Sequence, residues 1–314
     1  MDKEHKEKIL VIKLSALGDF IQALGPMKAI RQHHPNAHIT LMTTPMFKSY
    51  AKKCGYFDEI WCDNTRPKMP NIFSWLSFRK KLINAKYTRV YDLQNNDRTN
   101  IYFQLFPKHK RPEWVGAAKG ASHENNSPER TAGHAFDGHK QTLALVEIKN
   151  VSVDTMDWIN EDISAFNLKK PYILLIPGSA PQHPQKRWPA QKYAEIANKL
   201  TVDGYTIVLL GTDSEKDVTS KIHELGPDCV NLTGKTSLFQ ITALAHNAEA
   251  AIGNDTGPMH IIGPTGCPTI ALFSGHSTPK RHAPLGKNVH TIQKENIEDI
   301  KSAEVLEIIK NIKN

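Results

Sequence analysis

The segment Ile9–Phe20, ILVIKLSALGDF, contains the first strand and turn of an alternating strand-helix pattern, and this pattern indicates the fold. Its first four residues form an apolar, strand-like run, and a helix-like stretch follows from Ile21 to Arg31. The residues between them are therefore predicted to form the turn from a first strand to a first helix. Such turns usually bind anions, because backbone N–H groups and the positive end of the helix dipole point there. This turn instead carries a carboxylate, Asp19, which calls for another explanation.

Chain length and composition indicate a globular protein with two domains. The 314 residues suffice for two ordinary domains, each with its own core. The longest apolar runs, such as Ile173–Ile176 and Ile207–Leu210, are strand-sized and far shorter than a bilayer span. The N-terminus lacks the pattern of a signal peptide, and the four cysteines form no C-x-x-C pair. We therefore expect reduced thiols and a cytoplasmic protein.

Positive charge is concentrated in the first half of the chain. Residues 1–163 contain 24 Lys and Arg against 18 Asp and Glu, a net charge of +6, whereas residues 164–314 contain 16 against 14, a net charge of +2. An excess of this kind fits an anionic partner, which can be a nucleic acid, an acidic lipid surface or a phosphorylated sugar.

Strand and helix signals alternate along both halves, which predicts parallel sheets with crossover helices. Residues 107–140, rich in Pro, Gly, His, Ser and Asn, are predicted to be a long functional loop region, and Ile297–Ile312 a packed helix. A second α/β unit is expected to begin near residue 165, with a cleft between the two. The predicted strands are Ile9–Ile12, His38–Met42, Glu59–Cys62, Arg89–Leu93, Tyr172–Ile176, Thr206–Leu210, Val230–Leu232, Ala250–Ile252 and Thr269–Leu272.

Three stretches in the second half follow predicted strands, where parallel sheets bind ligands. Pro177–Ala180 and the later Lys186 suit phosphate oxygens, although Gly-Ser loops are common. In Gly211–Glu215 a carboxylate can accept hydrogen bonds from ribose hydroxyls, and capping of a helix is an equal alternative. In Gly253–His260, GNDTGPMH, the turn can offer a hydroxyl and N–H groups to a diphosphate; the alternative is an Asp N-cap with a packed histidine.

Four motifs occur in order along the chain: LSALGD (14–19), DLQ (92–94), KRWP (186–189) and GNDTGPMH (253–260), followed by Pro268-Thr269 and Leu272-Phe273. Together they resemble glycosyltransferase family 9, which contains the ADP-heptose:lipopolysaccharide heptosyltransferases. The resemblance runs in order from Lys13 to about Pro284. It implies a GT-B fold of two Rossmann-like domains facing across a cleft, with the acceptor on residues 1–163 and the nucleotide-sugar on residues 164–314.

The resemblance also implies a role for Asp19, as the catalytic base. Independently, glycosyl transfer with inversion needs a carboxylate to take the proton of the attacking hydroxyl. On this reading the turn holds no phosphate because the diphosphate belongs to the second domain. The donor-binding residues that the resemblance implies are Gly178, Ser179, Lys186, Glu215, Thr236, Asp255, Thr256, Gly257 and His260. The sequence departs from the family at Gly178–Ala180, where paired threonines are usual, and at Thr236, where a methionine is expected.

The acceptor side is less closely defined by the sequence. Lys13 can orient the acceptor, balance Asp19 or serve a structural role. Arg98 and Lys119 are candidates for contacting an anionic acceptor, and for Arg98 an ion pair with Asp92 or Asp97 is the alternative. The insertion Trp114–His139 departs from the family pattern and leaves the acceptor open.

The function that the resemblance implies is inverting transfer of a heptose, or a related sugar, from ADP-heptose to a lipopolysaccharide or lipooligosaccharide core. The anionic glycolipid acceptor implies peripheral contact with the inner face of the cytoplasmic membrane. We expect no metal and no cofactor beyond the nucleotide-sugar, because the histidines lack ligand spacing. A GT-B-fold sugar-nucleotide epimerase is the alternative enzyme. A nucleic-acid-binding protein is less favoured because interleaved aromatic residues are missing, and a nicotinamide oxidoreductase because no G-x-G-x-x-G follows a strand.

Overall fold

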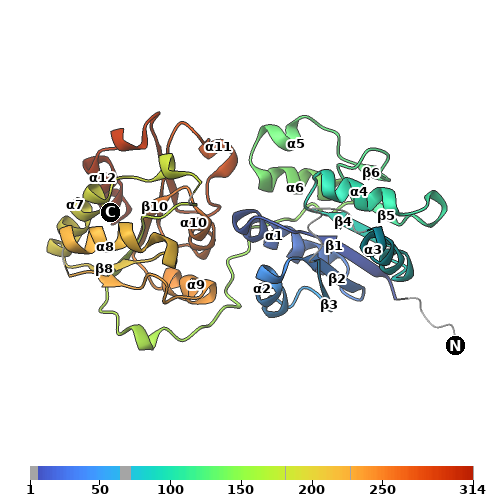
Figure 1. Ribbon diagram of the computed structural model, residues 1–314, viewed down its shortest axis with the longest axis horizontal. Helices are drawn as coiled ribbons and strands as arrows, with labels where there is room; N and C mark the ends of the chain where they lie inside the picture. Colours follow the sequence, from blue (N-terminus) through green and yellow to red (C-terminus); the bar gives the residue numbers. More distant parts are fainter. Residues whose placement is uncertain (1–5, 64–71, 181, 227, 314) are drawn as a thin grey trace. The chain divides into compact units, whose positions relative to one another are not determined.

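The computed structural model of the chain describes residues 6–63, 72–180, 182–226 and 228–313 (Figure 1). The chain divides into two compact units, residues 1–154 and 155–314. The first unit extends to Asp154, whose buried carboxylate accepts a hydrogen bond from the Tyr56 hydroxyl. The predicted boundary at residue 163 lies nine residues further along, inside the second unit.

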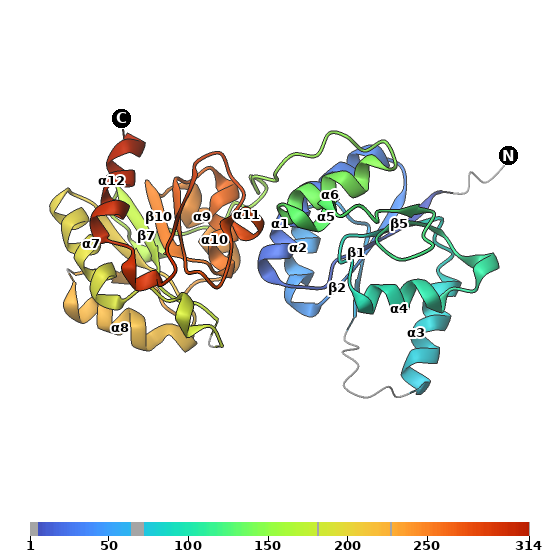
Figure 2. The ribbon, with the colours of Figure 1, turned by 90° about the horizontal axis from the view of Figure 1, so that it is seen from above.

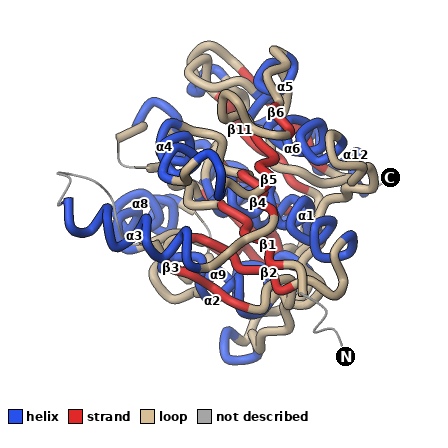
Figure 3. Tube along the Cα trace, turned by 90° about the vertical axis from the view of Figure 1, so that its right-hand side faces the viewer, coloured by secondary structure: helices blue, strands red, loops and turns tan. Residues whose placement is uncertain are grey.

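The first unit is a parallel six-stranded sheet with helices on both faces (Figures 2 and 3). Helices α1 and α6 cover one face, and α3 and α4 cover the other. The strands run in the order β3-β2-β1-β4-β5-β6. They are β1 (Lys8–Ile12), β2 (His38–Thr43), β3 (Glu59–Cys62), β4 (Arg89–Asp92), β5 (Glu113–Gly116) and β6 (His123–Glu124). The helices are α1 (Leu17–His33), α2 (Lys48–Lys53), α3 (Ile72–Asn84), α4 (Asp97–Leu105), α5 (Glu129–Ala132) and α6 (Ala135–Ala144), with 3₁₀ turns η1 (Pro45–Phe47) and η2 (Lys108–Lys110).

The second unit repeats this plan, with the strand order β12-β11-β10-β7-β8-β9. Helices α7, α8 and α12 lie on one face of its sheet, and α9 and α10 on the other (Figure 2). Its strands are β7 (Tyr172–Ile176), β8 (Thr206–Leu209), β9 (Val230–Asn231), β10 (Ala250–Asn254), β11 (Thr269–Phe273) and β12 (Val289–Gln293). Its helices are α7 (Ala190–Val202), α8 (Lys216–Leu225), α9 (Leu238–His246), α10 (Gly257–Ile262), α11 (Pro279–His282) and α12 (Ser302–Lys313), with 3₁₀ turns η3 (Ser164–Phe166), η4 (Pro184–Lys186), η5 (Asp213–Glu215), η6 (Gly263–Thr265) and η7 (Ile297–Asp299).

The central strands are apolar because helices exclude water from both faces of each sheet. Residues Ile9–Ile12 of β1 and all five residues of β7 are buried. All nine predicted strands are confirmed, each within two residues of its predicted bounds. Strand β12 was not predicted, because it is an edge strand whose polar residues His290, Thr291 and Gln293 are exposed, and it pairs with β11 alone.

The prediction of a loop over residues 107–140 was wrong. Strands β5 and β6 extend the first sheet there, and helices α5 and α6 follow. Their sequences, EWVG and HE, contain at most two consecutive apolar residues, so they gave no apolar run. Helix α6 contains Gly138 because an added Cβ would lie 2.4 Å from the carbonyl oxygen of Arg130. The abundance of Pro, Gly, His, Ser and Asn in residues 107–140 therefore reflects short strands and helices that pack closely together.

The predicted C-terminal helix over 297–312 is interrupted near its start. Turn η7 covers Ile297–Asp299, and α12 begins only at Ser302. The carbonyl oxygen of Ile300, between them, accepts hydrogen bonds from the indole N–H of Trp188 at 3.0 Å and from Lys192 Nζ at 2.7 Å. Because these side chains occupy the carbonyl, the helix starts after it.

Each sheet has one point where the strand order reverses. The first strand of each unit lies between its second and fourth strands, so the reversal falls between β1 and β4 and between β7 and β10. Crossover connections leave these two pairs in opposite directions, and ligands bind in the crevice that results beyond the carboxyl ends of the strands. The sequence motifs at 14–19, 92–94, 177–189 and 253–260 lie at the carboxyl ends of β1, β4, β7 and β10 or in the loops that follow.

Candidate active site

The turn after β1 is held by residues that follow β4. The side-chain oxygen of Gln94 accepts hydrogen bonds from the backbone N–H groups of Leu14 at 2.8 Å and Ser15 at 3.1 Å. In the other direction, Lys13 Nζ donates to the carbonyl oxygen of Leu93 at 3.1 Å. The two loops of this reversal point are thus tied together, which fixes the start of α1.

Asp19 is the third residue of α1, and its side chain is exposed. Its Oδ2 atom accepts a hydrogen bond from the N–H of Ala16 at 3.1 Å. The first turn of a helix favours a negative charge, so the carboxylate caps the helix and stays accessible to solvent. The structure therefore gives Asp19 a capping contact and leaves it reachable by a hydroxyl group.

Two buried charged groups lie beneath this turn. Burial lowers the pKa of Lys13, and the carboxylates of Asp19 and Asp92 oppose that effect. Burial likewise raises the pKa of Asp92, which is opposed by hydrogen bonds, first from the N–H of Asn95, and by the charge of Lys13. The Lys13 side chain is 4% exposed, so it is buried under the turn and has a structural role there.

His139 of α6 contributes a third titratable group in this region. It is buried, and burial together with the positive charges of Lys13 and Arg130 lowers its pKa to about 3. A neutral imidazole beside the Lys13 ammonium avoids a second unfavourable buried charge.

Arg98 and Lys119 occupy different environments. Arg98, on α4, forms an ion pair with Asp63 at 2.5 Å, and its Nε donates to the Tyr102 hydroxyl at 2.5 Å. The predicted alternative partners Asp92 and Asp97 are therefore replaced by Asp63, which follows β3. Lys119 is exposed in the connection from β5 to β6, beyond the carboxyl end of β5.

In the second unit, Asn254 joins the loops around the reversal point. Its Nδ2 donates to the carbonyl oxygens of Pro177 at 2.7 Å and Gly178 at 3.2 Å. Its Oδ1 accepts from the N–H of Trp188 at 3.1 Å and the hydroxyl of Tyr193 at 3.0 Å. A fully buried amide with these partners fixes the loops that follow β7 and β10.

Lys186 and Asp255 meet at this reversal point. Their Nζ and Oδ2 atoms lie 2.6 Å apart, with 19% of the lysine and 9% of the aspartate side chain exposed. A lysine held at the carboxyl ends of parallel strands is suited to phosphate oxygens, and the carboxylate beside it to sugar hydroxyls.

Glu215 lies against the loop after β7. An added Cβ on Gly178 would lie 1.7 Å from its Oε1 atom, so only glycine leaves room for this carboxylate. Glu215 Oε2 accepts from the N–H of Thr212 at 2.7 Å and the Thr212 hydroxyl at 3.0 Å. Glu215 therefore caps the helix, as the alternative expected. It also lies against Gly178, in the loop that was predicted to bind phosphate.

The loop after β7 is braced by Arg187. The buried Ser179 hydroxyl donates to the carbonyl oxygen of His183 at 2.9 Å and accepts from Arg187 Nε at 3.1 Å. A second guanidinium nitrogen of Arg187 donates to the Ser179 carbonyl oxygen at 3.0 Å. Ser179 is thus committed to the shape of the loop.

The remaining predicted donor residues lie at the carboxyl edge of the same sheet. Thr256 is the N-cap of α10, and Gly257 is its first residue. His260 of this helix is buried, as the structural alternative expected, but the N-cap is Thr256 and not the aspartate of that alternative. Thr236 is half-buried and directly precedes Ser237, the N-cap of α9.

Sequence reasoning assigned no role to Asn254, Gln94 or Arg187, which hold the loops. Each lies within a quoted motif, and for Asn254 and Gln94 the available signal was a polar residue at the carboxyl end of a buried strand. The partners of Asn254 and Gln94 are 61 to 80 residues away in the sequence, so the contacts could not be read from spacing.

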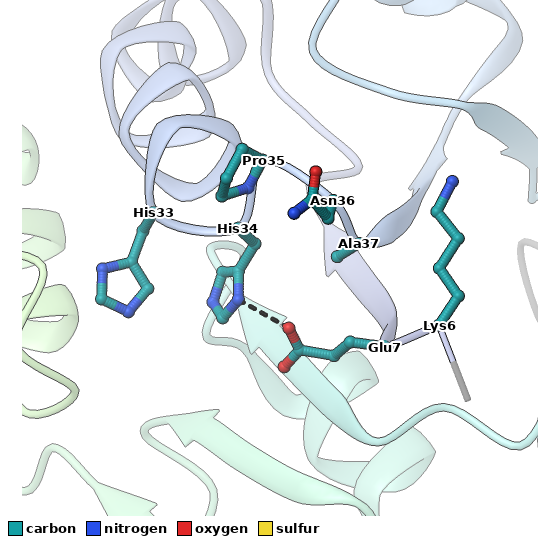
Figure 4. Close-up of a pocket in the computed structure, with 7 residues that line it drawn as sticks. All are labelled: Lys6, Glu7, His33, His34, Pro35, Asn36 and Ala37. Carbon is teal, nitrogen blue, oxygen red and sulfur yellow. Dashed lines mark hydrogen bonds and ion pairs between the residues drawn. The ribbon is translucent and has the colours of Figure 1, made fainter. Parts of the chain in front are cut away.

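Two open cavities lie away from these loops. One, of about 660 Å³, is lined by Lys6, Glu7, His33, His34, Pro35, Asn36 and Ala37 (Figure 4). In it the His34 ring lies 2.8 Å from Glu7. The other, of about 370 Å³, is lined by Lys6, Lys8, His38, Thr40, Glu59, Ala85 and Tyr87. Both border the amino ends of β1 and β2, opposite the edge that carries Asp19.

In the described part of the chain, no group of three or more His, Cys, Asp or Glu side chains could hold a metal ion. None of its helices has the length and apolar character needed to cross a membrane.

The chain is similar to known proteins of one family, which the sequence comparison identifies. Residues 75–312 match the model of glycosyltransferase family 9 (heptosyltransferase). Lipooligosaccharide heptosyltransferase 2 of Haemophilus influenzae is 36% identical over 130 residues, which are 40% of this chain and 37% of that protein. Lipopolysaccharide heptosyltransferase 2 of Escherichia coli is 25% identical over 326 aligned positions, covering 91% of this chain and 88% of that protein.

Solved structures have the same fold. A glycosyl transferase family 9 protein from Veillonella parvula matches with a TM-score of 0.83 at 20% identity, covering 98% of this chain and 97% of the other. The E. coli ADP-heptose lipopolysaccharide heptosyltransferase II matches with a TM-score of 0.74 at 22% identity, covering 97% and 98%. These likenesses confirm the predicted α/β fold with two Rossmann-like domains of the GT-B type.

Proposed function

The chain belongs to glycosyltransferase family 9, and on that premise we propose that it transfers a heptose from ADP-heptose to the core of a lipopolysaccharide or lipooligosaccharide, with inversion. Membership of this family makes the chain a glycosyl-transfer enzyme. It favours group transfer over the sugar-nucleotide epimerase and the nucleic-acid-binding protein that the sequence left open. The relatives named as heptosyltransferases support a heptose as the transferred sugar.

The observation that carries the proposal is the ion pair of Lys186 and Asp255 at the reversal point between β7 and β10. On binding of the donor, Lys186 turns from the carboxylate to the diphosphate, whose charge it neutralises as the nucleotide leaves. Asp255 then accepts hydrogen bonds from sugar hydroxyls. Pairing in the absence of donor keeps the lysine ammonium at the place where the diphosphate binds.

The remaining donor contacts follow from the order of the strands. The Glu215 carboxylate accepts the ribose hydroxyls beside Gly178, and Ser179 shapes the loop that faces the diphosphate. Thr256 and Gly257 offer a hydroxyl and backbone N–H groups to the phosphates, with His260 one turn further along α10. Thr236, in the loop between β9 and α9, contacts the adenine.

In the first unit, we assign the general base to Asp19. Its exposed carboxylate takes the proton of the acceptor hydroxyl as that oxygen attacks the anomeric carbon, and the bond from that carbon to the diphosphate breaks. Attack from the face opposite the leaving group gives inversion. Gln94 and Lys13 position the turn that presents Asp19.

For the acceptor, we propose an anionic glycolipid core contacted by Lys119 and by the exposed edge of Arg98. Lys119 has an exposed side chain at the same sheet edge as Asp19, and the first half of the chain carries the basic excess. Such an acceptor is anchored in a membrane, so we propose a cytoplasmic enzyme that contacts the inner face of the cytoplasmic membrane peripherally.

A thermal-shift panel tests the donor assignment. ADP should raise the unfolding temperature more than UDP, GDP or CMP at equal concentration, because a ligand at a hundred times its Kd stabilises the fold by about 2.7 kcal/mol. Lys186→Met should abolish most of the shift, whereas Lys199→Met, which removes a lysine from an exposed ion pair on α7, should not. Equal shifts for all four nucleotides would contradict the ADP assignment.

A further inference from the structure

Helix α3 (Ile72–Asn84) has two apolar faces, of which the core uses one. On the inner face, Phe78 is 7% and Leu82 1% exposed. The Phe78 ring lies 4.8 Å from the ring of Tyr102 on α4 and 5.2 Å from that of Trp61 on β3. This face accounts for the attachment of α3 to the sheet.

The outer face carries large apolar side chains in solvent. Ile72 is 65%, Phe73 77% and Leu76 55% exposed. Ile72 and Leu76 are four residues apart and therefore form one row along the helix, with Phe73 beside it. A surface helix normally has a polar outer face. An apolar outer face therefore indicates that this side of the helix binds a partner.

The same row continues into positive charge. Lys80 follows Leu76 by four residues, and Arg79 and Lys81 flank it; all three are exposed. Arg79 Nε donates to the carbonyl oxygen of Leu105 at 2.9 Å, and Lys81 Nζ lies 3.9 Å from the centre of the Trp61 ring. Lys80 therefore belongs most clearly to the outer face. The α3 sequence IFSWLSFRKKLIN contains no Asp or Glu.

A second group of basic residues lies close to this end of α3. The contact of Arg79 with Leu105 joins the basic half of α3 to the end of α4, and the exposed turn η2 (Lys108–Lys110) begins three residues later. The surface therefore combines an apolar half with a basic half. We call it the α3 surface, defined by Ile72, Phe73, Leu76 and Lys80.

We propose that the α3 surface docks the enzyme on an anionic phospholipid bilayer. Ile72, Phe73 and Leu76 enter the boundary between headgroups and acyl chains, while the Lys80 ammonium reaches lipid phosphates. Anionic lipid is the partner that satisfies both halves at once, since a nucleic acid would leave the aliphatic residues without an apolar environment. This docking surface rests on the proposed function, because an enzyme that acts on a membrane-anchored glycolipid needs to contact the membrane.

Co-sedimentation of the full chain with vesicles tests the proposal. Wild-type protein should bind vesicles of phosphatidylcholine with phosphatidylglycerol and bind pure phosphatidylcholine weakly. The double variant Phe73→Ser/Leu76→Ser should lower partitioning about tenfold or more, and Lys80→Gln about fivefold on anionic vesicles alone. A matched control, Val202→Ser/Leu225→Ser, removes exposed apolar residues from α7 and α8 (80% and 49% exposed) and should bind like wild type.

Failure to bind anionic vesicles, or equal binding by the double variant and wild type, would overturn the proposal. An ADP-induced thermal shift verifies that each variant is folded, and Lys80→Gln provides a second test on a solvated side chain. Activity separates this proposal from the function. Transfer to a delipidated core oligosaccharide without any vesicle binding would refute the docking surface and leave the function standing. Vesicle binding without transfer to any core acceptor would refute the proposed function and leave the docking surface standing.

Discussion

Lys186 and Asp255 lie 69 residues apart in the sequence, yet their Nζ and Oδ2 atoms are 2.6 Å apart. The pair forms because β7 and β10 are neighbours in the sheet, so the loops that leave their carboxyl ends meet. Asn254, the last residue of β10, holds both loops through its amide. This contact brings together the motifs at 186–189 and 253–260, which are far apart in the sequence.

Substitutions in this pair should separate nucleotide binding from sugar binding. Lys186→Met should raise the Kd for ADP and for ADP-heptose about tenfold to a hundredfold, because a charge-assisted hydrogen bond contributes about 1.5–3 kcal/mol. Asp255→Asn frees the lysine, so ADP affinity should hold or improve while the Kd for ADP-heptose rises. Calorimetry with both ligands measures this. Equal losses for ADP and ADP-heptose in Asp255→Asn would argue against a sugar contact.

Gly178→Ala should displace Glu215, because the new Cβ would lie 1.7 Å from the carboxylate. We expect a higher KM for the nucleotide-sugar with a smaller change in kcat, as for removal of a contact made equally in ground and transition states. Glu215→Ala should give the same phenotype. Gly133→Ala is the matched control, since an added Cβ there meets nothing within 4 Å. An unchanged KM in both site variants would confine Glu215 to helix capping.

The sequence was most informative where local chemistry decides structure. Buried parallel strands such as β1 and β7 are apolar runs, and their following loops carry the motifs, so the fold and the loops of the candidate site were predictable. Strand β12 was not, because its exposed edge residues give no apolar run.

Contacts between distant segments were beyond sequence reasoning. Nothing in the spacing indicates that Glu215 lies against Gly178 or that Gln94 holds Leu14 and Ser15. Arg98 shows the same limit: its expected partners were neighbours in sequence, Asp92 and Asp97, whereas the sheet brings it to Asp63.

Arg98→Ala should destabilise the fold, because it removes the ion pair that Arg98 forms with the Asp63 side chain, which is 1% exposed. Breaking a buried pair costs about 3–5 kcal/mol, and the partial exposure of Arg98 places this one nearer 2–3 kcal/mol. Asp63→Asn in the same chain should restore part of the loss, as measured by urea denaturation. If Arg98→Ala keeps its stability and raises the acceptor KM, the residue serves the acceptor instead of the fold.

His139 should make stability fall in acid. Its pKa is lowered from 6.5 to about 3 in the folded chain, so between these values the unfolded state binds more protons. The stabilisation is complete above 6.5 and is lost as the pH falls toward 3, by at most about 1.4 kcal/mol per pH unit. His139→Gln should flatten the pH dependence of the urea midpoint, whereas His109→Gln, at an exposed position, should not. Parallel curves for His139→Gln and wild type would refute the assignment.

The central claim, that Asp19 drives acceptor-dependent transfer from ADP-heptose, is tested most directly by one assay. ADP release is followed with ADP-heptose in the presence and absence of a heptose-free core glycolipid, and the product is identified by mass spectrometry. In wild type, release should require the acceptor, and the acceptor should gain one heptose. In Asp19→Asn, turnover should fall by a factor of roughly 10²–10⁴ with the ADP-induced thermal shift unchanged. ADP release that needs no acceptor, or near wild-type transfer by Asp19→Asn, would contradict the account.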